Sequence, residues 1–315
     1  MSELTSETRA APADGGGKPP EIELWSNRRV IHPISRWLVT RLIPTGISPN
    51  QVSCLSVVAC ALAAAAYRLV PWPFGAAAGF ALHVGWHVLD GADGDLARRT
   101  GRSSPSGEIV DGLCDYLSHL ILYATLAVML SAQIGGWAWP VAAASGLARA
   151  IQANSYESRR RTYQYWMQGG AWLKQTLASD QAAAAGQRMS GLLRRFGGAY
   201  LAVSERISGP APGLDAALRS RAHGGPEALA AMRSLYREHQ AHALRSSFPL
   251  SSNARTVALF ASMLAGSPLY FFCYEVIGLS LVLIATLIQQ RRCDAALLSA
   301  LAQGSRQSAP GRLSV

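Results

Sequence analysis

The amino-acid sequence predicts an all-α integral membrane protein with about six transmembrane helices, because its composition is apolar and its apolar residues are gathered in long tracts. Of the 315 residues, 50% are hydrophobic and only 15% are charged, whereas charged residues make up about 25% of an average globular protein. The tracts cover residues 51–90, 107–152 and 254–290, and most of the charge lies in residues 153–252. A soluble enzyme is therefore not expected.

Each predicted span follows from the length of an apolar segment, since a helix needs roughly 20 apolar residues to cross the hydrocarbon core of a bilayer. The segments are approximately 51–70, 72–90, 107–130, 136–153, 254–270 and 271–290. Arginines flank one end of the paired spans, and the connections at the other end contain neither Lys nor Arg. The positive-inside rule then places both termini and the long polar insert in the cytoplasm.

The segments outside the spans are expected to be tails, a surface helix and a basic insert. Residues 24–42 mix aliphatic and aromatic residues with arginines, which is typical of an amphipathic helix on an anionic membrane surface. The insert has helix-like stretches near 171–207 and 225–245 and no nucleic-acid-binding motif, so we expect it to lie on the same leaflet. The expected divisions are a disordered tail at 1–23, an interfacial amphipathic helix at 24–45, a catalytic core of four spans at 46–155, a cytoplasmic helical insert at 156–252, the last two spans at 253–292 and a C-terminal tail at 293–315.

Four aspartates lie where the second predicted span ends and the third begins. Asp90 and Asp93 are three residues apart, and Asp111 and Asp115 are four residues apart. Each pair therefore occupies one face of its helix. Ionisable groups at the edge of a membrane are costly to keep there and usually serve a function. Two facing helices would present the four carboxylates across a shared gap.

Small residues beside the aspartates would keep this gap open. Gly94 and Ala97 continue the carboxylate face of one helix, and Gly107 begins that of the other, so that a ligand or a backbone can approach closely. Crowded carboxylates repel one another unless a cation neutralises them. Mg2+ and Mn2+ prefer oxygen ligands, and a pair of such ions stabilises the charge that develops when a phosphate group is transferred. The pattern thus predicts a divalent-metal site for phosphoryl-type transfer.

The same residues satisfy a longer pattern, D-x2-D-G-x2-A-R-x8-G-x3-D-x3-D, without a gap. Its fixed positions are Asp90, Asp93, Gly94, Ala97, Arg98, Gly107, Asp111 and Asp115. In this pattern, and over roughly residues 30–155, the chain resembles the CDP-alcohol phosphotransferase family, also called the CDP-alcohol phosphatidyltransferases. Residues 48–53 are also similar to a short Pro-Asn segment of the family at the start of the first span, which makes Asn50 a candidate for the nucleotide pocket.

The resemblance implies a membrane-bound transferase of phospholipid biosynthesis with CMP as its leaving group. It would have six helices, an active site open to the cytosol, two Mg2+ or Mn2+ ions, a CDP-alcohol donor and a lipid or small-alcohol acceptor. Carried over by position, Asp115 would be both a metal ligand and the general base. The metal ligands would be Asp90, Asp93, Asp111 and Asp115, and the CDP-binding residues would be Asp90, Asp93, Gly94, Ala97, Arg98, Gly107 and Asp111. Membrane lipids are expected as neighbours, nucleic acid is not expected as a partner, and a homodimer stays open.

Other polar residues admit both a functional and a structural interpretation. Arg149 and Arg255 lie near the inner ends of their spans and are candidates for binding a phosphate of the acceptor or donor, although setting the topology would explain them equally. His119 lies one turn beyond the last motif aspartate, and its part in catalysis is left open. Asp95 points away from the carboxylate face and is expected in a solvated loop, while Ser104 is expected to cap the third span.

The donor alcohol is not determined by these residues. The arginine-rich, compact six-span layout looks bacterial, which favours CDP-diacylglycerol as the donor and an inner (cytoplasmic) membrane with the active site facing the cytoplasm. Residues 97–108 look more like a choline or ethanolamine phosphotransferase. From a different class, a divalent-cation transporter would also place carboxylates in a membrane, but it would not require Arg98 or the spacing to Gly107.

Overall fold

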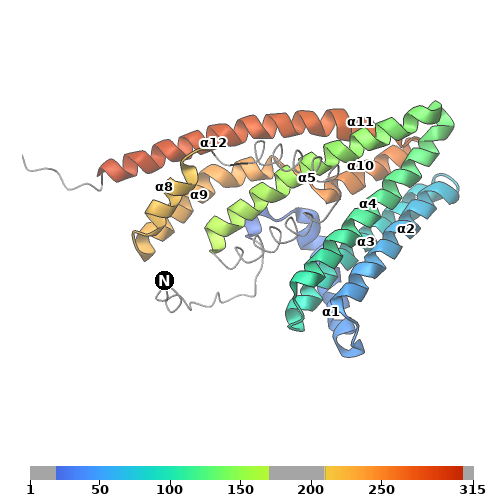
Figure 1. Cartoon of the computed structure of the whole chain (residues 1–315), viewed down its shortest axis with the longest axis horizontal. Helices are drawn as coiled ribbons and strands as arrows, with labels where there is room; N and C mark the ends of the chain where they lie inside the picture. The colour runs from blue at the N-terminus through green and yellow to red at the C-terminus, as the bar shows by residue number, and fades with distance from the viewer. Residues whose placement is uncertain (1–18, 170–208, 210, 308–315) are drawn as a thin grey trace, which may run out of the picture.

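The structure is a computed structural model that describes residues 19–169, 209 and 211–307, and every regular element in these residues is helical (Figure 1). The expected helical stretch at 171–207, most of the N-terminal tail and residues 308–315 lie outside the described residues. The main helices are α1 (His32–Leu42), α2 (Pro49–Leu69), α3 (Phe74–Arg99), α4 (Pro105–Ile134), α5 (Ala138–Gln168), α8 (Leu214–Ala222), α9 (Pro226–Arg245), α10 (Ser252–Leu264), α11 (Leu269–Cys273) and α12 (Leu279–Gln307). The all-α prediction is confirmed for the described part of the chain.

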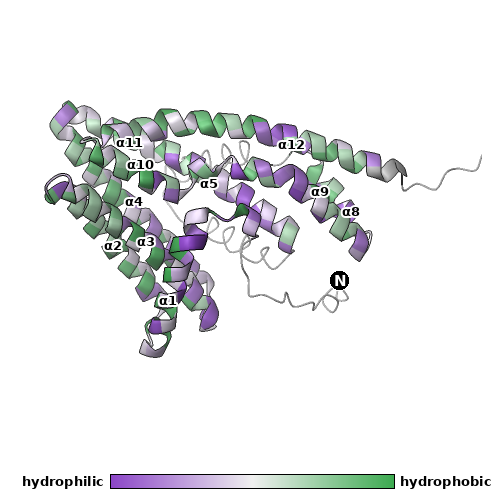
Figure 2. Ribbon diagram, turned by 180° about the vertical axis from the view of Figure 1, so that it is seen from behind, coloured by the Kyte–Doolittle hydropathy of each residue, from purple (hydrophilic) through white to green (hydrophobic). Residues whose placement is uncertain are grey.

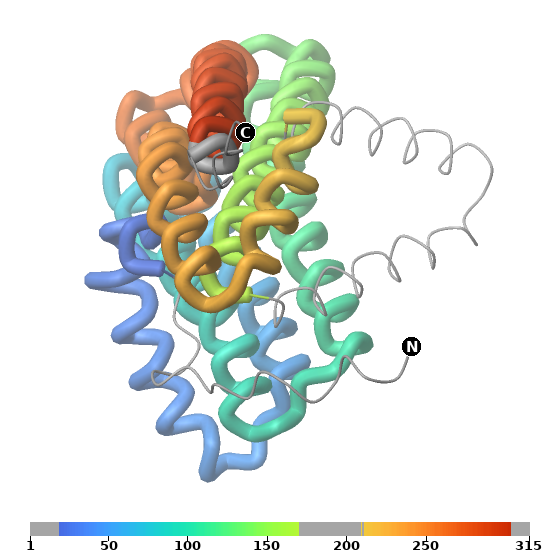
Figure 3. The backbone as a smooth tube through the Cα atoms, turned by 90° about the vertical axis from the view of Figure 1, so that its left-hand side faces the viewer, coloured from blue at the N-terminus to red at the C-terminus, as the bar shows by residue number. Residues whose placement is uncertain are grey.

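Two large hydrophobic cores organise these helices, and a smaller cluster packs α1 against α2 and α3. The first lies among α2, α3, α4, the start of α5, α10 and α11. The second lies among the end of α5, α8, α9 and α12, and Figure 3 shows these last helices side by side. Helices α8 and α9 carry much more hydrophilic sequence than α2 or α11 (Figure 2). Since α5 contributes to both cores, it joins an apolar bundle to a more polar one.

The apolar bundle contains helices that suit a bilayer. Three stretches of the described residues are long and apolar enough to cross a membrane: Pro49–Leu69, Pro105–Gln168 and Leu269–Gln303. The second of these is formed by α4 and α5, which meet at the 3-10 turn Gly135–Trp137. Together with the composition, these helices show a membrane protein. That the protein has six transmembrane spans stays a prediction.

Local signals explain where α2 and α4 begin. At the start of α2, the side chain of Ser48 accepts a hydrogen bond from the Gln51 backbone N–H, and the side-chain oxygen of Gln51 accepts one from the Ser48 backbone N–H, which is a capping box. At the start of α4, Ser104 accepts a hydrogen bond from the Gly107 backbone with Pro105 in the first helical position, so the predicted cap is confirmed. These caps set the register of the helices that carry the motif.

Helix α3 differs from the sequence prediction because it continues through the whole motif segment. Asp95 was expected in a solvated loop, and this expectation was wrong, since α3 ends only at Arg99. The Asp95 carboxylate pairs with Arg99 Nε at 3.0 Å and with Arg98 Nη2 at 3.7 Å, one turn further along the same helix. Pairs at these spacings support a helix. The first motif aspartates therefore stand on one rigid element.

The expected divisions of the chain also change. Helix α5 runs without a break past residue 155 to Gln168, so the insert starts as a continuation of the fourth predicted span. Helix α12 is helical as far as Gln307, where a C-terminal tail from 293 was expected, and its Leu297 and Leu301 are buried. At the other end, Pro20–Ile22 forms a 3-10 turn instead of a disordered tail. In each case, packing on the second core orders residues that hydropathy alone assigns to tails.

The turn at Pro20–Ile22 is held by both side chains and backbone. Ile22 is buried in the second core, and the Glu21 carboxylate accepts hydrogen bonds from Tyr163 Oη at 3.0 Å and Arg237 Nε at 2.9 Å. Arg245 Nε donates to the Glu21 carbonyl at 2.7 Å. Burial raises the pKa of Glu21, but the hydrogen bonds and the Arg237 charge outweigh it and leave the pKa below its ordinary value. The N-terminal segment is thereby fastened to α5 and α9.

A buried ion pair lies where the two cores meet. Arg255 on α10 is 2% exposed and Glu275, in the π-helical turn Tyr274–Gly278, is 0% exposed, and Arg255 Nη1 lies 2.5 Å from Glu275 Oε1. The Glu275 carboxylate also accepts hydrogen bonds from Ser145 Oγ at 2.6 Å and from Tyr123 Oη. Gln152 accepts from Arg255 Nη2 at 2.8 Å and donates to the Glu275 carbonyl at 2.9 Å. The pair thus connects α4, α5 and α10 to the start of the last long helix.

Removing one member of this pair should destabilise the protein much more than replacing both. Glu275→Gln leaves the Arg255 charge buried without a counter-charge, which we expect to cost about 3–5 kcal/mol of unfolding free energy. The double variant Arg255→Met with Glu275→Leu fills the same space without charge and should recover most of that loss. Unfolding of the purified proteins in the same detergent measures both. A double variant as unstable as Glu275→Gln would contradict this account.

Candidate active site

Helix α2 packs against both α3 and α4, and so brings the two halves of the acidic motif together. Asp93 on α3 is 5% exposed, and its Oδ2 accepts a hydrogen bond from Ser53 Oγ on α2 at 2.6 Å. Its Oδ1 accepts from the Gly94 backbone N–H at 2.5 Å. The side chains of Asp93 and Asp111 are in hydrogen-bonding contact, although they come from different helices. The predicted facing of α3 and α4 is therefore present at this pair.

Two carboxyl groups in contact require a proton or a cation between them, because two bare carboxylates repel each other. This pair supplies the hard oxygen donors that Mg2+ and Mn2+ prefer. Within residues 19–169 and the described residues from 209 on, however, no three Asp, Glu, His or Cys side chains gather as a metal-binding group. The structure thus brings Asp93 and Asp111 together, but it does not gather Asp90 or Asp115 with them into one metal-binding group. Asp90 is half-buried on α3, and Asp115 lies one turn further along α4. The acidic pair fits a divalent ion, and the remaining ligands stay predictions.

Close approach explains the glycine at position 107. A Cβ on Gly107 would lie 3.2 Å from Ser104 Oγ, which is tighter than most real contacts, and 3.5 Å from Asn50 Oδ1, which is an ordinary contact distance. The structure therefore places Asn50, the candidate for the nucleotide pocket, directly beside the motif glycine. At Gly94 a Cβ would lie 3.3 Å from Arg98 Nη1. Arg98 is otherwise largely exposed, so its guanidinium is open to a ligand.

His119 and Arg149 form a chain that ends at Asp115. Arg149 Nη2 contacts His119 Nε2, and because an arginine nitrogen only donates, Nε2 must be the acceptor. The proton of the neutral ring then sits on Nδ1, which lies 2.7 Å from the Asp115 carbonyl and 3.3 Å from Asp115 Oδ1. His119 is therefore a donor to the last motif aspartate, and Arg149 determines which tautomer is present.

A small cavity lies behind this chain, and both arginines singled out in the sequence line it. Arg255 is less available than expected, because its terminal nitrogens are engaged by Glu275 and Gln152. Its Nε, however, has no hydrogen-bond partner, and the same holds for two other buried atoms on the cavity wall, His83 Nδ1 and Trp86 Nε1. Buried polar atoms without partners are rare in proteins. Their convergence on one cavity indicates room for a polar group.

Several of these residues were not found by sequence reasoning. Trp86, Gln152 and Glu275 lie in apolar tracts with no motif around them. Only the folded helices bring Trp86 to the cavity wall, and Gln152 and Glu275 to Arg255. Ser53 is different, since it lies three residues after Asn50 in the Pro-Asn segment and on the same helical face. That spacing was a usable signal for a residue that holds the motif helix.

The fold and the site define a class of protein, namely a helical membrane protein with carboxylates from two neighbouring helices around a site for oxygen-bound cations. Residues 46–178 match the family model of the CDP-alcohol phosphatidyltransferases, and this part of the chain belongs to the family. It is therefore an enzyme that transfers a phosphate-linked alcohol from a CDP-alcohol. All eight motif positions lie within the matched range, which confirms the resemblance seen in the sequence.

Substitutions at His119 should separate its two hydrogen bonds. An Asn side chain can place an N–H where His119 has Nδ1, whereas a Gln side chain places its amide where Nε2 lies. We expect His119→Gln to lower kcat for CMP release about 10- to 100-fold, with an unchanged KM for the CDP-alcohol, because Asp115 loses its donor. His119→Asn should retain most of the activity. Equal losses in the two variants would show that only the packing of the ring matters.

Proposed function

We propose that the protein transfers a phosphate-linked group from CDP-diacylglycerol to the hydroxyl of an acceptor and releases CMP at the cytoplasmic face of a bacterial inner membrane. The observation that carries the chemistry is the contact between Asp93 and Asp111, which joins the two halves of the family motif. The donor class is supported by the compact, arginine-rich layout of the chain.

Asp90, Asp93, Asp111 and Asp115 would hold two Mg2+ or Mn2+ ions. When bound, these ions supply Lewis-acid stabilisation of the charge on the transferred phosphate and on the departing CMP oxygen. Ser53 holds Asp93 in place for this role through the 2.6 Å hydrogen bond. Asn50, Gly107 and Arg98 would border the nucleotide. Gly107 and Asn50 pack closely together, and Arg98 is largely exposed.

Asp115 would accept the proton of the acceptor hydroxyl. As that O–H bond breaks, the oxygen attacks the phosphorus next to the diacylglycerol, and the bond from the same phosphorus to the CMP oxygen breaks. The Nδ1–H of His119 orients the Asp115 carboxyl for this transfer, and Arg149 keeps the ring in the required tautomer. The acceptor hydroxyl must then lie on the cavity side of Asp115.

The cavity beside His119 would receive the rest of the acceptor. Arg149, Arg255 Nε and Trp86 Nε1 point hydrogen-bond donors at it, so a phosphate or several hydroxyl groups on the acceptor would satisfy them. Arg255 would act through its Nε–H and not as a fork, since Glu275 and Gln152 engage its terminal nitrogens. This supports a small polar acceptor.

The outer helices would lie on the cytoplasmic leaflet. The π-helical turn Asn27–Ile31 and α1 form the predicted surface helix, in which Trp25, Ile34 and Trp37 are exposed. Exposed apolar side chains beside arginines fit an interface between headgroups and acyl chains. The N-terminal turn at Glu21 then ties this surface helix to α9.

Asp111→Asn should abolish most of the activity, because it removes one carboxylate from the contacting pair. We expect CMP release from CDP-diacylglycerol in Mg2+ or Mn2+ to fall at least about 100-fold. Asp95→Asn is the matched control on the opposite face of α3, where it weakens a partly exposed ion pair with Arg99 and leaves the acidic pair in place, and should change the rate by less than about twofold. Divalent-cation uptake into vesicles without CMP release would instead support a transporter.

A donor comparison tests the substrate class. Purified protein is given CDP-diacylglycerol, CDP-choline or CDP-ethanolamine with a membrane lipid extract and small polyols, and mass spectrometry identifies the product. We expect a new phosphatidyl product with CDP-diacylglycerol alone, since the cavity suits a polar acceptor. Product from CDP-choline or CDP-ethanolamine would overturn the proposed donor while leaving the family activity in place.

A further inference from the structure

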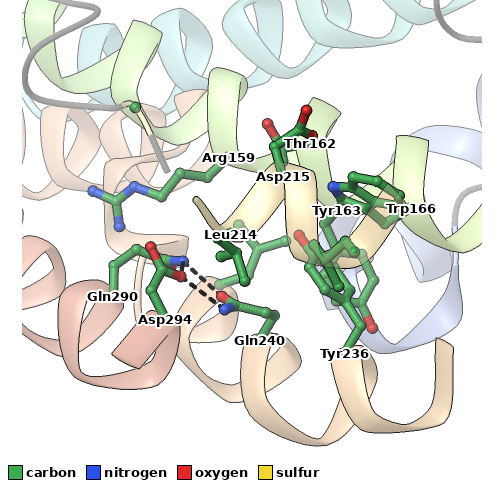
Figure 4. Close-up of a pocket in the computed structure, with 13 residues that line it drawn as sticks. Arg159, Thr162, Tyr163, Trp166, Leu214, Asp215, Tyr236, Gln240, Gln290 and Asp294 are labelled. Atoms are coloured by element: carbon green, nitrogen blue, oxygen red, sulfur yellow. Dashed lines mark hydrogen bonds between the residues drawn. The ribbon is translucent and has the colours of Figure 1, made fainter. Parts of the chain in front are cut away.

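A second and larger cavity lies outside the motif helices. It lies between the end of α5, α8, α9 and α12, within the second hydrophobic core (Figure 4). None of its lining residues belongs to α2, α3 or α4. The space between helices of a bundle is a usual place for a small-molecule site. The cavity is therefore separate from the acidic motif.

A buried cation without a counter-ion forms part of its wall. Arg159 is 7% exposed, and among the described residues its guanidinium donates only to neutral oxygens: Ser155 Oγ at 3.0 Å, Ser247 Oγ at 3.2 Å and the Thr286 carbonyl at 3.4 Å. Its Nε has no partner, and Arg159 forms no ion pair with any described residue. A buried charge is costly unless a counter-charge and hydrogen bonds compensate it. Arg159 therefore has the capacity to bind one more acceptor.

The nearest carboxylate on the wall does not fill that capacity. Asp294 is 2% exposed and accepts hydrogen bonds from the Ala211 backbone N–H at 3.1 Å, Gln240 Nε2 at 2.8 Å and Gln290 Nε2 at 2.8 Å. Figure 4 shows this group of side chains close together on the side of the cavity toward which Arg159 extends. Because neutral donors satisfy Asp294, its charge is held apart from Arg159 although the two attract each other. The polar side of the cavity thus has a hydrogen-bond donor without an acceptor, the Nε–H of the Arg159 guanidinium.

Aromatic rings form the other side of the cavity. The ring centroids of Tyr163 and Tyr236 are 5.6 Å apart, and those of Trp166 and Tyr236 are 6.4 Å apart. In Figure 4 these three rings cluster away from Arg159, with Leu214 between the two sides. Such a surface favours binding of a ligand whose non-ionic part is flat or apolar.

From this arrangement we propose that the cavity between α5, α8, α9 and α12 is a second ligand site, which binds a compact oxyanion, phosphate or carboxylate, attached to an aromatic or other apolar body. The oxyanion accepts from Arg159 Nε, and the body packs on Tyr163, Trp166 and Tyr236. The chemistry is shared by a soluble organic phosphate and by the headgroup of a single-chain lipid. The site is independent of the proposed transfer reaction.

Binding to the intact protein in detergent tests the proposal with three probes: phenyl phosphate, a short-chain lysophosphatidic acid and inorganic phosphate. Calorimetry should show saturable binding of one of the first two, weaker binding of inorganic phosphate, and an affinity at least about tenfold lower in Arg159→Gln. Arg149→Gln, in the other cavity, is the control and should bind like the unchanged protein. Tighter binding of phenyl phosphate assigns the site to soluble ligands, and tighter binding of the lysophosphatidic acid assigns it to lipid.

Hydrogen exchange on the unaltered protein keeps the test independent of whether Arg159→Gln folds. The bound probe should slow exchange in α8 and α9, which line the cavity but contribute nothing to the acidic motif. Absence of binding, equal binding by Arg159→Gln, or protection confined to α3 and α4 would overturn the proposal. CMP release is measured separately, so failure of the transfer reaction leaves this result unaffected.

Discussion

The buried pair of Arg255 and Glu275 is the interaction on which the arrangement of the site depends. Neither charge reaches solvent, so every compensating hydrogen bond must come from neighbouring helices held at fixed distances. Tyr123, Ser145 and Gln152 provide those bonds from α4 and α5. The pair thereby holds α10 and the π-helical turn against α4 and α5, which carry the proposed base Asp115 and its neighbours His119 and Arg149. It also leaves one Arg255 N–H facing the cavity behind Asp115.

Helix α5 extends from the apolar bundle into the more polar one. Helix α5 carries Arg149, which contacts His119, and also Arg159, which lines the outer cavity. These two arginines are ten residues apart on one unbroken helix, or about 15 Å. The polar helices α8 and α9 pack against each other and on α12, and α9 also packs on α5. Helix α5 therefore connects them to the proposed active site.

Much of the fold and the motif was predictable because it depends on local sequence. The capped start of α4 at Ser104, the carboxylate faces of α3 and α4, and the apolar lengths of α2 and α4 all follow from spacing within single segments. Asp95 shows the limit of such reasoning. Its polarity suggested a loop, yet ion pairs one turn away keep it helical.

By itself, the sequence determined the family, the all-helical membrane character and the identity of the acidic motif, since these depend on residue types at fixed spacings. Only the tertiary structure decided which side chains meet across helices. The contact of Asp93 with Asp111 and the ion pair of Arg255 with Glu275 each join residues from separate elements. Arg159 Nε, in contrast, is buried without a hydrogen-bond partner among the described residues. Hydropathy and periodicity describe one helix at a time, whereas the energy of a buried charge depends on its neighbours from all of them.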